Sequence, residues 1–183
     1  MKNNLMRGLA VALLASASVT APAFANPMVG GAPMYASKNI VENAVNSQDH
    51  TTLVAAVKAA GLVDTLESAG PFTVFAPTNE AFAKLPDGTV DTLLKPENKG
   101  TLTSVLTYHV VPGRLTSHKI ASMIRMGGGR ATLKTVQGED LTATMMHGKL
   151  MLTDAKGGMS MVTIANVMQS NGVIHVVDTV LMP

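Results

Sequence analysis

The spacing of apolar residues changes once along this chain, near Arg130, and that change sets the class of fold. From residue 38 to about residue 124 the apolar residues recur every three or four positions, as along one face of an α-helix. After Arg130 they alternate with polar residues, as in a β-strand with one buried face. Helices followed by strands predict an α+β fold. A chain of 183 residues is long enough for one such domain.

The helical spacing occupies five stretches of the N-terminal half. Apolar stripes cover residues 40–45, 53–60, 62–68 and 89–94, and a further helix begins at Pro96 and carries Leu102, Val105, Leu106 and His109 on one face. Each stripe covers only one side of its helix. We therefore expect these helices to form a layer that packs on a sheet.

The segment TVFAPTNEAFAKLP, residues 73–86, predicts a strand that leads directly into a helix. Its first residues are aromatic and β-branched, which is typical of a strand. Pro77 ends the strand, and Thr78 is a natural N-cap for the helix that follows. Catalytic groups often lie at such joints, but the uncharged Thr78-Asn79 pair is better explained as hydrogen bonding that fixes a corner.

Two hairpins are predicted in the C-terminal half. The first joins residues 141–146 to 149–153 through His147-Gly148 and pairs Met145 with Leu150, so that one face is apolar. The second joins residues 162–168 to 173–181 through Asn171-Gly172. Because the strands of the second hairpin are apolar on both faces, we expect them in the middle of the sheet.

The first 25 residues are typical of a secretory signal peptide. A basic start with Lys2 and Arg7 precedes an apolar stretch, and Ala23-Phe24-Ala25 fits a cleavage site after Ala25. Residues 26–37 hold two glycines and two prolines without periodicity, which predicts a flexible leader. The folded domain is expected to span residues 38–183. Export then places the mature chain in the periplasm or outside the cell.

Charge and cysteine content exclude several classes of protein. Without residues 1–25 the chain carries 12 basic and 12 acidic residues and no basic cluster, so nucleic-acid binding is not expected. It contains no Cys, so the core rather than disulfides must hold the fold. No stretch of the mature chain is apolar over the roughly 18 residues that a membrane-spanning helix requires.

Three stretches together resemble the fasciclin domain family. GPFTVFAPTNEAFAKLP at residues 70–86 resembles the family's first block, LTYHVVPG at 106–113 its Tyr-His motif, and NGVIHVVDTVLMP at 171–183 its second block. Their order and spacing also fit. The motif positions carried by this chain are Phe72, Phe75, Pro77, Thr78, Asn79, Phe82, Gly172, His175 and Asp178.

The resemblance implies a fasciclin-like fold, in which a helical layer packs on a wedge of β-strands. It also implies a role in adhesion or in association with the extracellular matrix, with a protein or polysaccharide of the cell surface or matrix as the partner. In animal members the motif at Tyr108-His109 is implicated in adhesion. From the residues alone, His109 on an apolar helical face is more simply a core histidine.

The sequence offers no catalytic set and implies no cofactor. Nucleophilic Cys is absent, and no Gly-x-Ser-x-Gly elbow occurs. No two histidines stand at metal-ligand spacing. Gly127-Gly128-Gly129 lacks the Lys-Ser/Thr that completes a phosphate-binding loop, and it predicts a turn between helix and sheet. We therefore expect a protein without enzymatic activity.

Two alternatives remain open at this point. One is a carrier of a small hydrophobic ligand, with a groove between helices and sheet near Phe75, Phe82 and Tyr108. The other is a Cu(I) site in the periplasm, because thioethers are soft ligands. Its candidate residues surround the first hairpin: Met146, His147, Met151, Met159 and Met161. Methionine as a flexible core filler explains the same residues more simply.

Overall fold

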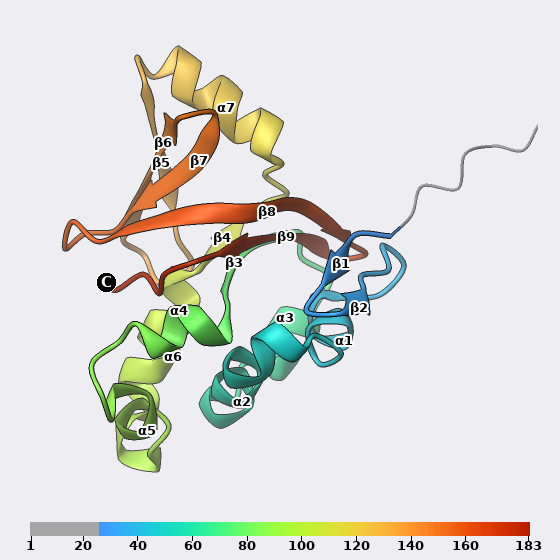
Figure 1. Ribbon diagram of the computed structural model, residues 1–183, viewed down its shortest axis with the longest axis vertical. Helices are drawn as coiled ribbons and strands as arrows, with labels where there is room; N and C mark the ends of the chain where they lie inside the picture. The colour runs from blue at the N-terminus through green and yellow to red at the C-terminus, as the bar shows by residue number, and fades with distance from the viewer. Residues whose placement is uncertain (1–25) are drawn as a thin grey trace, which may run out of the picture.

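The computed structural model describes residues 26–183. The predicted signal peptide and its cleavage after Ala25 therefore lie outside the described residues. Within them the protein forms a helical layer below a large sheet, with one helix on the sheet's other side (Figure 1). The α+β class predicted from the change of period is confirmed.

The helical layer contains six α-helices, all from the first part of the described chain. They are α1 (Ile40–Ala44), α2 (Thr51–Ala60), α3 (Val63–Glu67), α4 (Asn79–Ala83), α5 (Thr89–Leu93) and α6 (Lys99–Tyr108). Short 3-10 turns at Gln48–His50 and Pro96–Asn98 precede α2 and α6. A seventh helix, α7 (Ser117–Met126), lies apart from this layer and contacts the strands that follow it in sequence.

Seven strands make the main sheet, in the order β4-β3-β9-β8-β7-β6-β5. They are β3 (Phe72–Pro77), β4 (Val110–Pro112), β5 (Arg130–Lys134), β6 (Asp140–Met146), β7 (Lys149–Thr153), β8 (Met159–Gln169) and β9 (Gly172–Val177). All neighbours are antiparallel except β3 and β9, which run parallel with Phe72 opposite Gly172.

The two faces of the sheet support two separate apolar cores. Val74 and Ala76 of β3 face the helical layer and join the first core, whereas Phe75 between them joins the second. The second core fills the space between β5–β7, α7 and the centre of the sheet. Alternation along a strand thus sends neighbouring residues into different cores. The strand β3 connects the two halves of the molecule.

The register predicted for the first hairpin is confirmed. Met145 lies opposite Leu150 and Ala143 opposite Leu152, with His147 and Gly148 at positive φ in the turn. The inward residues of this hairpin are almost fully buried in the second core. Turn chemistry and alternation agreed here, so the local sequence was sufficient.

The turn of the second hairpin was predicted one residue too late. Gln169 pairs with Gly172, so Ser170 and Asn171 form the turn. The Asn171 side chain accepts a hydrogen bond from Ile40 N at 3.1 Å and donates to the carbonyls of Leu66 and Ser68. Asn171 is therefore a link to the helical layer. The strands β8 and β9 do lie in the middle of the sheet, as expected.

Residues 26–37 differ from the predicted flexible leader. Met28–Val29 (β1) and Ala32–Pro33 (β2) form an antiparallel pair, and Val29 and Met34 are buried in the first core. Asn43 donates to the Tyr35 carbonyl at 2.8 Å and accepts from Tyr35 N at 3.1 Å. The folded domain therefore includes this segment, and the boundary at residue 38 is wrong. Its glycines shape the turn of a small hairpin.

Candidate functional site

The Tyr108-His109 motif lies at the end of α6, inside the protein. The exposed fractions of Tyr108 and His109 are 0% and 2%. The Tyr108 hydroxyl donates to the Asp140 carbonyl at 3.0 Å and accepts from Ala155 N at 3.0 Å. Burial raises the pKa of Tyr108. The tyrosine thus joins α6 to both ends of the β6–β7 hairpin, and its hydroxyl already donates one hydrogen bond and accepts another.

His109 connects α6 to the C-terminal segment. Its Nδ1 donates to the Val105 carbonyl at 2.8 Å, and its Nε2 accepts from Leu181 N at 3.0 Å. An acceptor at Nε2 requires a neutral ring. Burial lowers the pKa of His109 to about 4, which keeps the ring neutral near pH 7. For either side chain of the motif to touch a partner directly, this part of the fold would have to open.

The joint after β3 is held by the uncharged pair Thr78 and Asn79. Thr78 Oγ1 accepts from Ala81 N at 3.2 Å and so caps α4. The Asn79 side chain accepts from Thr52 N at 3.0 Å and donates to the Gln48 carbonyl at 2.8 Å. The two residues thereby fix the start of α4 to the start of α2. No acid or nucleophile takes part in these contacts.

Replacing Thr78 by Ala is expected to lower the free energy of unfolding by about 1 kcal/mol through the lost helix cap. Urea denaturation of the purified protein measures the change. Thr101→Ala, at an exposed position of α6, is the matched control and should change stability by less than about 0.5 kcal/mol. Equal effects of the two substitutions would contradict the capping role.

The other motif residues also make scaffold contacts. A Cβ on Gly172 would collide with the Phe72 carbonyl, so only glycine allows β3 and β9 to approach there. His175 stacks on Phe75 with ring centroids 5.6 Å apart, and its Nε2 donates to the Leu115 carbonyl. Asp178 accepts from Met161 N at 2.9 Å.

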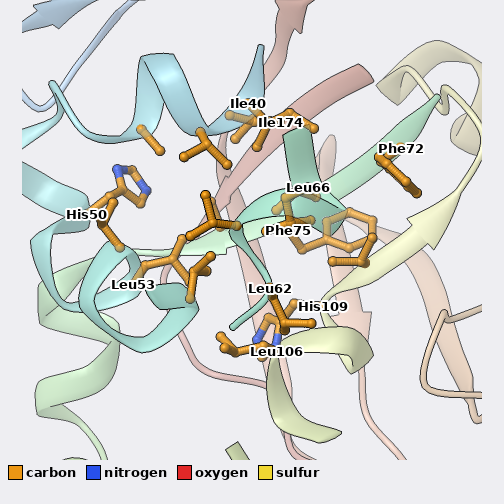
Figure 2. A pocket seen from close by; sticks show the side chains of 18 of the residues that line it. Ile40, His50, Leu53, Leu62, Leu66, Phe72, Phe75, Leu106, His109 and Ile174 are labelled. Carbon is orange, nitrogen blue, oxygen red and sulfur yellow. The ribbon is translucent and has the colours of Figure 1, made fainter. Parts of the chain in front are cut away.

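A cavity lies between the helical layer and β3, β4, β8 and β9 (Figure 2). Its volume is about 70 Å³, and its lining is almost entirely apolar, with Leu53, Leu62, Leu66 and Leu106 among the lining residues. Of the three residues predicted to line a ligand groove, Phe75 lines this cavity and Phe82 and Tyr108 do not. A drug-sized ligand needs roughly 300 to 1,000 Å³. The cavity as it stands is too small for such a ligand.

His50 is a polar residue beside this cavity that sequence reasoning did not select. Its side chain is buried, and Ser47 Oγ lies 2.8 Å from Nδ1. Among the buried side-chain nitrogen and oxygen atoms of residues 26–183, Nε2 alone has no hydrogen-bond partner. Burial lowers the pKa of His50, and the nearby backbone of Ala76 raises it by a smaller amount. The His50 ring does not form a hydrogen bond of normal geometry with Ala76.

The methionines proposed for Cu(I) lie on one face of β6–β8. Met151 is directly opposite Met161, Met146 is opposite Lys149, and Met159 is opposite Thr153. Only 7% of Met151 is accessible, because it lies on the central strand of the three. The ammonium group of Lys149 on the same face disfavours a bound cation. In the described residues no three His, Cys, Asp or Glu side chains form a metal cluster.

Charge is distributed unevenly over the molecule, and the neutral total conceals this. Residues 38–97, which contain α1–α5, carry eight acidic and four basic residues. Residues 98–138, which contain α6, α7 and β5, carry six basic residues and no acid. A count of charge in windows along the sequence would have found this difference.

Among residues 26–183, no helix is both long and apolar enough to cross a membrane.

Comparison with known proteins gives a consistent result. The family model described as "Fasciclin domain" matches residues 48–183. Protein sll1483 of Synechocystis sp. is 47% identical over 156 residues, which cover 85% of this chain and 79% of that protein. "Cell surface glycolipoprotein MPB83" of Mycobacterium bovis is 36% identical, over 92% of this chain and 79% of that protein.

A solved structure supports the same fold at lower sequence identity. It is the FAS1 domain pair from the insect cell adhesion molecule fasciclin I, with a TM-score of 0.72 and 17% identity. The match covers 80% of this chain and 51% of that chain, so this protein spans about half the length of the domain pair. The shared architecture is the helical layer with a wedge of strands.

Proposed function

Because this chain belongs to the fasciclin domain family, we propose that it is an exported, non-enzymatic protein that associates with a cell surface or extracellular matrix through one fasciclin domain. The main support for the proposal is that the side chains of the motif residues form contacts within the fold. Tyr108, His109 and Asn79 are occupied by contacts inside the scaffold. Recognition of a protein or polysaccharide partner then falls to the surface around a rigid core.

Export rests on the N-terminal sequence and agrees with the cell-surface relative. The basic start, the apolar stretch and Ala25 fit a cleaved signal peptide. Expression of the full gene should yield a mature protein that begins at Asn26, which N-terminal sequencing of the periplasmic and culture fractions measures. A protein that keeps residues 1–25 and remains in the cytoplasm would contradict export.

Adhesion is tested by deleting the gene and measuring surface attachment and cell aggregation. We expect attachment to fall and to return when the wild-type gene is restored. A pull-down with the mature domain from envelope and matrix components then identifies the partner. The control is a gene that lacks codons for residues 2–25, which should not restore attachment. Unchanged attachment in the deletion strain would remove support for the adhesive role.

The two alternatives have separate tests. A hydrophobic-ligand carrier should retain its ligand in native mass spectrometry, whereas the small cavity favours a clean apo mass. A Cu(I) site should retain metal in equilibrium dialysis under reducing conditions. Substitution of Met151 and Met161 by Leu should then remove the metal. Neither alternative explains the motif residues as well as the adhesive scaffold does.

A further inference from the structure

Four chain segments meet at one edge of the molecule and form a projecting tip. The C-terminal end of α7 lies beside the start of β5, because Gly127 packs directly against the backbone of Arg130. Arg130 pairs with Thr144 near the end of β6, and the following turn leads into β7 at Lys149. Figure 1 shows this end of α7 next to the ends of β5 and β6. We call residues 125–130 and 145–149 the α7 tip.

The tip carries three methionines that are exposed in the described structure. The exposed fractions are 81% for Met126, 44% for Met145 and 41% for Met146. Met145 and Met146 follow one another in β6 and leave the strand on opposite faces of this edge, and Met126 ends the adjoining helix, so apolar side chains lie on both sides of the tip. Methionine is flexible and adapts to irregular apolar surroundings.

Three basic residues lie in the same short segments as these methionines. Arg125, Arg130 and Lys149 are exposed at the tip. No acidic residue occurs in residues 98–138 or 141–153. Glu139 and Asp140 lie at the opposite end of the β5–β6 pair, where Asp140 contacts Lys134 at 3.2 Å. The positive charge of the tip is therefore not balanced by a neighbouring carboxylate.

The helical layer has the opposite sign of charge. Its residues 38–97 carry four more acidic than basic residues. An anionic surface would repel this layer and attract the tip, which orients the molecule with α7 and the β5–β6 end towards that surface. The two signs are separated along the molecule, since α7 lies on the opposite side of the sheet from the helical layer.

We propose that the α7 tip docks on an anionic lipid bilayer, with Arg125, Arg130 and Lys149 on the headgroups and the three methionines at the headgroup–acyl boundary. This rests on the proposed function, for which it names the surface that the protein contacts. Interfacial membrane binding combines apolar side chains at the headgroup boundary with Lys and Arg attracted to anionic lipids, and the tip has residues of both kinds. Each basic side chain near such a surface adds attraction that salt screens.

The composition of the tip favours lipid over polysaccharide. Sugar rings are commonly held against aromatic faces, and the tip has none. The chain has no Trp and two Tyr, of which Tyr108 is buried and Tyr35 lies beside α1. Thioether side chains offer apolar contact without directed hydrogen bonds, which suits acyl chains.

Vesicle co-sedimentation with the mature chain tests the proposal. The probes are vesicles of phosphatidylcholine alone and of phosphatidylcholine mixed with phosphatidylglycerol. The charge variant combines Arg125→Gln, Arg130→Gln and Lys149→Gln, and its matched control combines Lys58→Gln, Lys95→Gln and Lys99→Gln on the helical layer. The apolar variant combines Met126→Ser and Met145→Ser, and its control is Met28→Ser at an exposed site in β1.

We expect the wild type to bind only the vesicles that contain phosphatidylglycerol. Added salt should weaken this binding. At low salt the charge variant should bind roughly 100-fold less tightly, because each of the three basic residues contributes about fivefold. The apolar variant should bind more weakly at every salt concentration, and both controls should match the wild type.

Three outcomes of the binding experiments would overturn the proposal. They are absence of wild-type binding to anionic vesicles, equal loss in the charge variant and its control, and binding to an acidic polysaccharide that survives while vesicle binding is absent. The last outcome leaves the adhesive role in place and assigns the tip to a different partner. Loss of attachment in the deletion strain together with full attachment by the charge variant would also reject the tip while retaining the proposed function.

Discussion

Acidification from neutral pH to about pH 4.5 is expected to lower the free energy of unfolding by about 2 to 3 kcal/mol through His109 alone. The pKa of this ring falls from 6.5 to about 4 on folding, because burial disfavours the charged form. Between these two values the unfolded chain binds a proton that the folded protein does not. The free energy of unfolding therefore rises with pH across this range. The contribution of the neutral His109 ring reaches its full value above about pH 6.5.

Burial lowers the pKa of His50 and His175 as well, so their contributions have the same sign. Urea denaturation at a series of pH values measures the total. His109→Gln keeps an acceptor for Leu181 N without titrating in this range, and it should reduce the pH dependence by about 2 kcal/mol. His118→Gln, at an exposed position, is the control.

An NMR titration of the His109 ring provides the direct measurement and does not depend on a variant that folds. The ring should remain neutral down to about pH 4. Protonation of His109 near its ordinary value, or an unchanged pH profile in His109→Gln, would contradict the neutral buried ring.

Phe75→Ala is expected to lower the free energy of unfolding by about 3 to 5 kcal/mol. Phe75 is fully buried in the second core and stacks on His175. Its side chain leaves β3 on the face opposite Val74 and Ala76, so its removal opens a cavity in the second core. Chemical denaturation measures the loss, and near-ultraviolet circular dichroism reports whether tertiary packing survives.

Phe72→Ala is the matched control for Phe75→Ala. Phe72 is only partly buried at the start of the same strand, so its loss should be clearly smaller. A loss at Phe75 below about 1 kcal/mol would mean that the second core repacks around the missing ring. Similar losses at the two positions would show that burial does not determine the effect.

Local signals were sufficient where two of them agreed. The His147-Gly148 turn and the alternation on either side of it specified the β6–β7 register, and the structure has the same pairs. Thr78 was recognised as a cap from its place between Pro77 and an apolar stripe, and it caps α4. In both cases the interacting residues lie within a few positions of one another.

Local signals failed where a distant contact decides the structure. The three residues of β4 follow α6 immediately and form a strand only because β3 lies beside them. Asn171-Gly172 has the composition of a hairpin turn, but Gly172 is needed where β9 approaches β3. Residues 26–37 have the composition of a leader, yet Val29 and Met34 fill the first core. Composition does not specify such long-range partners.

The candidate site was harder to predict than the fold. Tyr108-His109 attracts attention as a pair of functional residue types, yet both side chains are occupied inside the scaffold. The α7 tip has no motif. It appears only when the turn after α7 and the turn after β6 are brought to the same edge, which requires the sheet order.

The parallel pairing of β3 with β9 has a consequence for the time course of folding. Residues 72–77 cannot complete their hydrogen bonds until residues 172–177 are present, although the intervening chain has already been synthesised. Contacts between such distant segments slow folding, because a long loop must close first. The central sheet thus stays incomplete for most of the time that the chain emerges from the ribosome. For a chain that is exported as proposed, a core that closes late leaves the polypeptide unfolded for longer and so available for passage through a secretion channel.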